Sequence, residues 1–146
     1  MDHSAHARGM TDDAATKFLH EAMPLCATLG VHVTSSTPEA VVVSMSWKPE
    51  LCTSNGLLHG GAIMALADSA AGACAFSNLP EGAIGTSTIE SKTNFFGAVK
   101  SGSITATASV LHRGSTTIVI ETSVRDDTDR LVAKVTQTQV VLRPRA

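Results

Sequence analysis

The chain has 146 residues, of which 43% are hydrophobic, and its formal net charge is −2. This length suits a single domain with a substantial core, whereas the charge and the scarcity of aromatic residues give no basis for binding nucleic acid. No apolar run is long enough to cross a bilayer. From these features, neither nucleic acid nor a membrane is expected as a partner.

Three widely spaced cysteines, Cys26, Cys52 and Cys74, form no CxxC motif. An odd number of cysteines without close pairs is typical of free thiols in a reducing compartment. The sequence therefore predicts a cytoplasmic protein without a zinc site, and it gives no sign of another metal or of a cofactor.

Residues 1–10 lack periodicity and are expected to form a flexible tail, which leaves residues 11–146 as one domain. Residues 11–29 are predicted to be helical, capped by Thr11-Asp12-Asp13 and kinked or split at Pro24. The apolar face of this helix is expected to contain side chains at helical spacing, namely Phe18, Ala22, Leu25 and Leu29.

Alternating apolar residues predict β-structure in much of the remaining chain. Residues 31–47 indicate a hairpin with a turn at 35–39. Further strands are predicted at 83–96, 103–111, 116–124 and 131–142. Strands that follow one another without intervening helices indicate an antiparallel sheet.

Residues 59–76 predict a helix that is apolar around almost its whole circumference, which indicates a buried position. Asp68 is its only charged residue, and no Lys or Arg occurs between Lys48 and Lys92 to neutralise it. A carboxylate without a partner in such a place is unfavourable unless it has a function, so Asp68 is the first catalytic candidate. Its helical face carries small residues that leave room for a ligand, namely Gly61, Ala65, Gly72 and Ala75.

The first turn of this helix offers a second feature. Its backbone N–H groups have no intrahelical partners and form the positive end of the helix dipole. Gly60 and Gly61 leave the backbone open to close approach. The N–H of Gly60 is therefore a candidate for stabilising an oxyanion, while Gly61 is expected to permit close packing.

The run Leu58-His59-Gly60-Gly61, with an acidic residue nine positions after the histidine, is similar to a known signature. It resembles hotdog-fold acyl-CoA thioesterases, most of all the group of the phenylacetate-pathway and 4-hydroxybenzoyl-CoA thioesterases. The likeness covers about residues 30–145, through segments at 94–102, 112–117, 124–127 and 131–133. It implies an α+β hotdog fold, in which an antiparallel sheet of about six strands wraps around a long central helix.

The resemblance implies roles for individual residues. Asp68 stands where the family has an acid that acts as a nucleophile or as a general base, and both roles stay open. Gly60 would supply the oxyanion hole, and His59 would orient the thioester or the active-site loop unless it only caps the helix. Thr88 aligns with a Ser or Thr that holds the attacking water. Ser87 is the alternative, because a register shift of one residue exchanges the two faces of a strand.

Further positions are candidates for binding the substrate. Thr53 stands where the family commonly has Asn or Gln, and Asn55 lies two residues later. Gly72 replaces the hydroxyl-bearing residue of the 4-hydroxybenzoyl group, so that hydroxyl is absent and space is left for an acyl group. By resemblance, Arg113 would contact a phosphate of coenzyme A from a turn of four residues, namely Arg113, Gly114, Ser115 and Thr116.

The predicted function is hydrolysis of an aryl- or medium-chain acyl-CoA to the free acid and coenzyme A. A hotdog acyl-thioester dehydratase and a non-catalytic acyl-CoA sensor are the alternatives. The spacing of His59 and Asp68 disfavours the dehydratase, and the lack of a basic DNA-binding segment disfavours the sensor. The resemblance further implies a homodimer or homotetramer, with the site between subunits and Thr88 facing the partner's Asp68.

Overall fold

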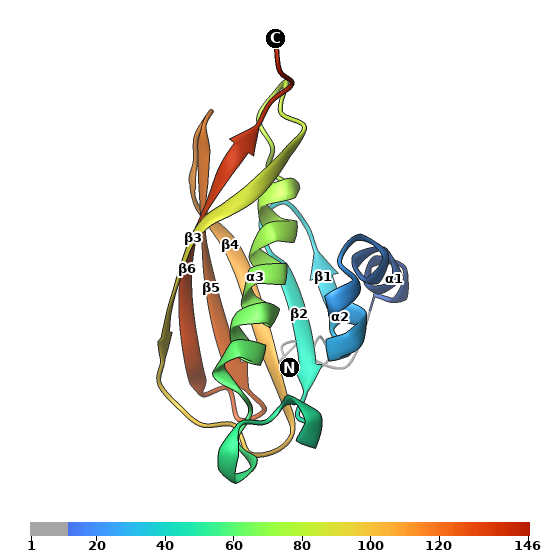
Figure 1. Ribbon diagram of the computed structural model, residues 1–146, viewed down its shortest axis with the longest axis vertical. Coiled ribbons are helices and arrows are strands. Elements are labelled where there is room, and N and C mark those ends of the chain that lie inside the picture. The colour runs from blue at the N-terminus through green and yellow to red at the C-terminus, as the bar shows by residue number, and fades with distance from the viewer. Residues whose placement is uncertain (1–11) are drawn as a thin grey trace, which may run out of the picture.

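The computed structural model describes residues 12–146, so the predicted tail at 1–10 and Thr11 lie outside the described residues. Within residues 12–146, three α-helices and six strands follow one another, with short 3₁₀ turns at Pro49–Leu51 and Ser54–Gly56 (Figure 1). The elements are α1 (Asp13–Ala22), α2 (Pro24–Leu29), β1 (His32–Ser36), β2 (Val41–Ser46), α3 (Gly60–Phe76), β3 (Gly85–Phe95), β4 (Ser103–Arg113), β5 (Thr117–Asp126) and β6 (Leu131–Leu142).

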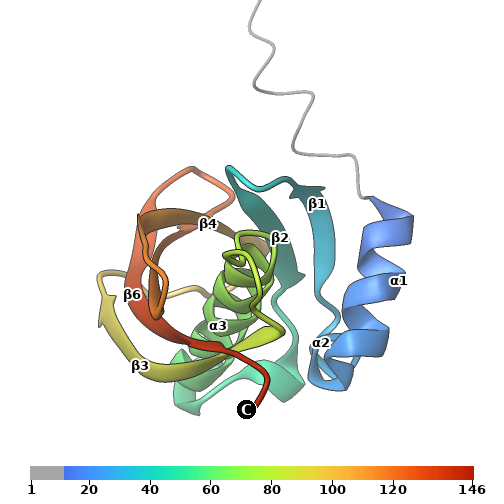
Figure 2. The same ribbon diagram turned by 90° about the horizontal axis from the view of Figure 1, so that it is seen from above.

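All six strands belong to one antiparallel sheet with the order β1-β2-β4-β5-β6-β3. The sheet curls around α3, and α1 and α2 lie beside β1 (Figure 2). Alternate strand residues face the helix and are buried, namely Val41, Val43, Met45, Ile104, Ala106, Ala108, Ile118, Ile120 and Val124. Burial of these apolar side chains against α3 is the main driving force for this arrangement, and the predicted hotdog fold is confirmed.

The N-terminal helical segment is split at Met23, which confirms the effect expected of Pro24. Its predicted apolar face is wrong, however, because Phe18 and Leu25 are 66% and 56% exposed. The spacing that grouped them assumed one continuous helix, whereas the break at Met23 changes the helical phase. Leu29 is buried as predicted, and the other buried apolar side chains of the two helices are Leu19 and Cys26.

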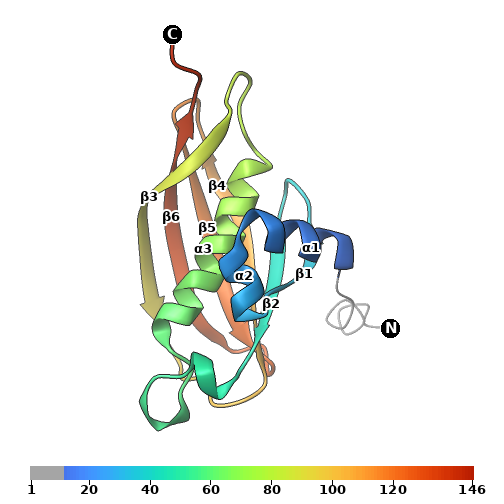
Figure 3. The ribbon, with the colours of Figure 1, turned by 45° about the vertical axis from the view of Figure 1, so that its right-hand side comes forward.

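Helix α3 is buried on most of its surface but not on all of it. Leu66, Ala67 and Ala70 are fully buried, whereas Asp68 is exposed and Gly72 is half-buried. The predicted burial of the helix is therefore confirmed for most of its residues, but not at Asp68. The edge strands β1 and β3 lie at opposite ends of the sheet and do not pair with each other, so the sheet leaves one face of α3 uncovered (Figure 3). Ala75, which was expected on that face, is fully buried.

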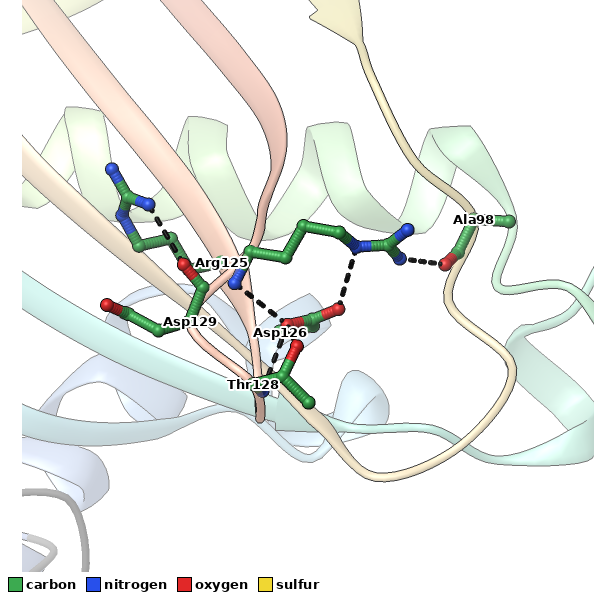
Figure 4. Close-up of polar contacts among 6 residues, drawn as sticks. Ala98, Arg125, Asp126, Thr128 and Asp129 are labelled. Carbon is green, nitrogen blue, oxygen red and sulfur yellow. Dashed lines mark hydrogen bonds and ion pairs between the residues drawn. The ribbon is translucent and has the colours of Figure 1, made fainter.

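A polar cluster in the β5–β6 turn fixes the loop that follows β3 (Figure 4). The Asp126 carboxylate accepts hydrogen bonds from the hydroxyl and the N–H of Thr128 at 2.8 and 3.0 Å, and from Nε of Arg130 at 3.1 Å. Arg130 Nη2 donates to the carbonyl of Ala98 at 2.6 Å, and the next carbonyl, that of Val99, accepts from Leu58 N–H at 2.8 Å. The turn is thus connected to the segment that enters α3.

We expect this cluster to stabilise the protein in a pH-dependent way. Hydrogen bonds from the Thr128 hydroxyl, and further ones from Arg130, hold the pKa of Asp126 below its usual value. A carboxyl whose pKa is lower in the folded state contributes stability above its unfolded pKa of about 3.9, and this contribution is lost as the pH falls through the folded pKa. Thermal unfolding should show that Asp126→Ala lowers Tm at pH 7, with a difference from wild type that shrinks below about pH 4. A difference that stays constant from pH 7 to pH 2 would contradict this assignment.

Candidate active site

Asp68 lies in the middle of α3 and is held by side chains from the sheet. Its Oδ1 accepts hydrogen bonds from Gln137 Nε2 at 2.7 Å and from the Thr88 hydroxyl at 3.2 Å. The Thr88 hydroxyl in turn accepts from Gln139 Nε2 at 2.7 Å and from Gln137 Nε2 at 3.1 Å. Because Thr88 is on β3 and both glutamines are on β6, the network joins the edge of the sheet to the central helix.

The surroundings of Asp68 differ from those expected. The residue is exposed in the single chain and not buried, and no ion pair reaches it from residues 12–146. Within that range, its side-chain hydrogen bonds come from two neutral donors, those of Gln137 and Thr88. A carboxylate that is oriented but not neutralised remains available as a base or nucleophile.

The structure places the Thr88 hydroxyl against the carboxylate of Asp68. Thr88 pairs with Gln139 in the β3–β6 register, and the register shifts by one residue between Thr88 and Glu90. This β-bulge at Ile89 changes the direction of neighbouring side chains, as bulges next to active sites often do. Thr88 contacts Asp68 of its own chain, so the expectation that it faces the partner's Asp68 is wrong.

At the start of α3, His59 caps the helix and the N–H groups of Gly60 and Gly61 differ in their hydrogen bonding. His59 is the N-cap, and its Nδ1 accepts the N–H of Gly61 at 2.7 Å. In the neutral imidazole this leaves the proton on Nε2. The N–H of Gly60 has no hydrogen-bond acceptor among residues 12–146. Of the first two N–H groups of the helix, only that of Gly60 is therefore free to bind an anion.

A cavity of about 530 Å³ opens beside Asp68, between α1, the C-terminal half of α3 and the first half of β3. Its apolar wall consists of Ala15, Phe18, Leu19, Ala22, Met23, Val33, Val41, Ala73 and Phe76. Its polar wall consists of Ser36, Asp68, Ser77, Thr86, Ser87, Thr88 and Gln139. Gly72 lines the cavity one turn after Asp68, and a Cβ at this position would meet no atom within 4 Å. An apolar group with space around it can therefore lie next to the carboxylate.

Thr53 and Asn55 are not part of the Asp68 network. Both are exposed on the loop before α3, and Asn55 adopts a left-handed conformation with φ of 64° in a 3₁₀ turn. The carbonyl of Gly56 accepts from Trp47 Nε1 at 3.0 Å, which fixes this turn. The loop leads to the Gly60 end of the helix, so these two residues belong with the helix start and not with the carboxylate.

The predicted coenzyme A turn lies at the β4–β5 junction, where Arg113 already has partners. Its Nε and Nη2 donate to the carbonyls of Asn78 and Leu79 at 2.8 and 3.3 Å. These bonds attach the turn to the loop after α3. A phosphate contact for Arg113 stays a prediction, and it would compete with both bonds. The rest of the turn is held through the carbonyls of Ser115 and Thr116 and the N–H of Gly114.

Sequence reasoning missed Gln137 and Gln139, which are 0% and 1% exposed. Both occupy inward positions of β6, where the alternation otherwise places Val135 and Val141. Two amides on the apolar face of a strand are the signal that could have revealed them, because buried polar side chains need partners.

Other chemistry is not supported near this site. Burial raises the pKa of the Cys26 and Cys74 thiols, which disfavours the thiolate that a cysteine nucleophile needs. Within residues 12–146, no group of three or more His, Cys, Asp or Glu side chains is placed to hold a metal ion. None of the helices in this range is long and apolar enough to cross a membrane.

Comparison with protein families matches residues 55–133 to the thioesterase superfamily. The chain belongs to this family. A 1,4-dihydroxy-2-naphthoyl-CoA hydrolase of Listeria monocytogenes is 30% identical over 110 residues, which are 75% of this chain and 89% of that protein. As a member of this family, the protein is a thioester hydrolase.

Solved structures show the same architecture. A Mycobacterium tuberculosis protein whose name suggests an esterase has a TM-score of 0.81 and 29% identity, covering 85% of this thioesterase and all of that chain. A Staphylococcus aureus thioesterase has a TM-score of 0.78 and 26% identity, covering 84% and 100%. Escherichia coli PaaI, from the phenylacetic acid degradation operon, shares the fold with a TM-score of 0.79, 22% identity and coverage of 86% and 89%.

Proposed function

We propose that this thioesterase hydrolyses an aryl- or medium-chain acyl-CoA, with Asp68 as the reacting carboxylate and the Gly60 N–H as the oxyanion donor. The observation that carries the proposal is the position of Asp68, which is oriented by neutral donors on the wall of an apolar cavity. The free thiols of Cys26, Cys52 and Cys74 further support a cytoplasmic location.

Two routes lead from this geometry to the products. As a general base, Asp68 takes a proton from water, and the resulting hydroxide adds to the thioester carbonyl carbon. As a nucleophile, Asp68 adds to that carbon itself, and loss of the thiolate leaves a mixed anhydride that water then hydrolyses. In both routes the C–S bond breaks, coenzyme A leaves as a thiolate that takes up a proton, and the acyl group becomes the free acid.

The length of α3 supports a site that two copies of the chain share. Gly60 and Asp68 are separated by eight residues, or about 12 Å along the helix. A single carbonyl must lie about 3 Å from its oxyanion donor and about 3–3.5 Å from the attacking group. One helix cannot satisfy both distances. Gly60 of one copy and Asp68 of a second copy, on antiparallel helices, would meet this requirement.

The edge strand β3 supports the same arrangement. It ends the sheet, so its outer N–H and C=O groups have no strand partner among residues 12–146. Ile89 and Phe95 on this strand are 62% and 48% exposed. Long edge strands with exposed apolar residues favour pairing with another chain. We propose a homodimer through β3, which can assemble further into a tetramer.

The lining of the cavity favours an aryl substituent. Phe18 and Phe76 can pack on a ring, and the hydroxyl of Thr86, which lines the same cavity, can bind a polar group on it. A plain alkyl chain would offer this hydroxyl no hydrogen bond. The name of the Listeria relative, which is a hydroxylated naphthoyl-CoA hydrolase, supports this preference.

Thr53 is proposed as the polar residue that meets the thioester from the loop side. Two structures of the Staphylococcus aureus thioesterase carry an alanine, one in place of a glutamine and the other in place of a glutamate fifteen positions later. In this chain Thr53 precedes Asp68 by the same number of residues. A shorter hydroxyl side chain at this position leaves more room than an amide.

The first test compares the wild type with Asp68→Asn on a panel of aryl- and alkyl-CoA thioesters. We expect the substitution to lower kcat by about 10²-fold or more, because it removes the base or nucleophile, with Tm nearly unchanged at this exposed position. Thiol release measures the rate. Hydrolysis that survives in Asp68→Asn would contradict the assignment.

The same panel distinguishes the alternatives. Hydration of an enoyl-CoA without thiol release would indicate a dehydratase. Tight binding of acyl-CoA without turnover by the wild type would indicate a sensor. Faster turnover of aryl than of alkyl thioesters would support the substrate class proposed from the cavity.

The second test removes the N–H of Gly60. Proline is favoured at the first position of a helix, and His59 has the extended conformation that a following proline requires, with φ of −64° and ψ of 132°. Gly60→Pro should therefore fold but lose about 10²–10³-fold in kcat. Gly60→Ala is the matched control, since it keeps the N–H and makes the same Cβ contact with the ring of Phe95.

Mixing the variants tests the shared site. Subunits of Gly60→Pro and Asp68→Asn, unfolded together and refolded at equal amounts, should recover about one quarter of wild-type activity, because half of the dimers then contain one intact site out of two. No recovery, with mixed dimers present, would contradict a site built from two copies.

The third test reduces the cavity next to the carboxylate. Gly72→Leu should lower kcat/KM for aryl-CoA by about tenfold or more while leaving acetyl-CoA hydrolysis nearly unchanged, because the new side chain extends into free space. Gly72→Ala is the control, and it should raise the free energy of unfolding by about 0.5–1 kcal/mol. An unchanged substrate profile in Gly72→Leu would show that the acyl group lies elsewhere.

A further inference from the structure

The two oxygens of the Asp68 carboxylate are not equivalent. Both hydrogen bonds, from Gln137 Nε2 and from the Thr88 hydroxyl, end on Oδ1. Oδ2 has no hydrogen bond to any residue between 12 and 146. An oxygen that accepts two hydrogen bonds is less basic and less nucleophilic than one that accepts none.

The Thr88 hydroxyl has no capacity left for a water molecule. A threonine hydroxyl has one proton and two lone pairs. Here the proton goes to Asp68, and the lone pairs accept from Gln137 and Gln139. The role that the resemblance implied for Thr88, holding the attacking water, is thus replaced by a role in orienting the carboxylate.

Gln137 occupies a position that stability alone does not explain. Its side chain is fully buried, and its Oε1 is an acceptor without a partner in the part of the chain that the structure describes. A buried polar atom without a partner destabilises the folded state, and an apolar side chain of similar volume would avoid this penalty. The opposite amide orientation would place Oε1 against the carboxylate and the hydroxyl, so Nε2 must face Asp68.

We propose that Gln137 is a positioning residue that fixes Asp68 through Oδ1 and leaves Oδ2 as the oxygen that reacts. Gln139 supports the same arrangement one step further away, because it contacts Thr88 and not the carboxylate. This inference rests on the proposed function of Asp68. It assigns the reacting atom and adds a residue from β6 to a site otherwise built on α3 and β3.

The test is Gln137→Met, which keeps an unbranched side chain of similar volume and removes both polar atoms. We expect kcat to fall about tenfold or more, KM to change little, and Tm to stay the same or rise. Thr122→Val is the matched control, since Thr122 on β5 is also fully buried with an unpartnered Oγ1 among the described residues, but makes no hydrogen bond to Asp68. The control should keep or raise Tm without changing kcat.

The outcomes separate positioning from a structural role. An unchanged kcat in Gln137→Met would overturn the proposal. A fall in kcat that comes with a clear fall in Tm would also overturn it, because general destabilisation would then explain the lost activity. A cycle of Gln137→Met, Asp68→Ala and the double variant, measured by urea unfolding, should be non-additive because the two side chains share a hydrogen bond. If the wild type hydrolyses no thioester, the proposed function fails, and the unfolding cycle still decides whether Gln137 holds Asp68.

Discussion

The packing of the sheet around α3 is the constraint on which the rest of this structure depends. The buried side of the helix carries small residues, among them Ala67, Ala70 and Ala71, so the strands can approach closely and curl around it. A sheet of six strands ends before it encloses the helix completely. The only charged residue of α3, Asp68, lies on the face that remains open, where water reduces the penalty of keeping its charge.

The same packing determines which groups reach Asp68. Because β3 crosses to the far edge of the sheet and pairs with β6, Thr88 and Gln137 arrive together beside the middle of the helix. The cluster around Asp126 connects the β5–β6 turn to the segment that enters α3. The pairing of β3 with β6 therefore orients the carboxylate, and the hydrogen bonds of the β5–β6 turn fix the segment that enters α3 at Gly60.

The donors to Asp68 are neutral, and this has a chemical consequence. A lysine or arginine in contact would hold the carboxylate in its charged form but would also weaken it as a base. Amide and hydroxyl donors on one oxygen orient the group and leave the other oxygen free. Gln137 provides one of these donors, although its own carbonyl oxygen has no partner among residues 12–146; a functional site often lowers stability in this way.

The sequence by itself determined the elements and the main catalytic candidates. Alternation identified all six strands, a long and almost uniformly apolar run identified α3, and Pro24 marked the break between α1 and α2. These signals depend on residues close together in the chain. Asp68 was found because it is the only charged residue of α3, and Gly60 because it is a glycine at the start of the same helix. The glutamines of β6 were missed because strand periodicity indicates a face but not what lies opposite it.

Only the tertiary structure decided the order of the strands, the open face of α3 and the partners of Asp68. The crossing of β3 from the neighbourhood of α3 to the edge beside β6 joins segments 49 and 69 residues apart. A bulge at Ile89 sets which hydroxyl faces the carboxylate. These outcomes depend on long-range packing of the whole sheet around the helix, and no local pattern of residues encodes them.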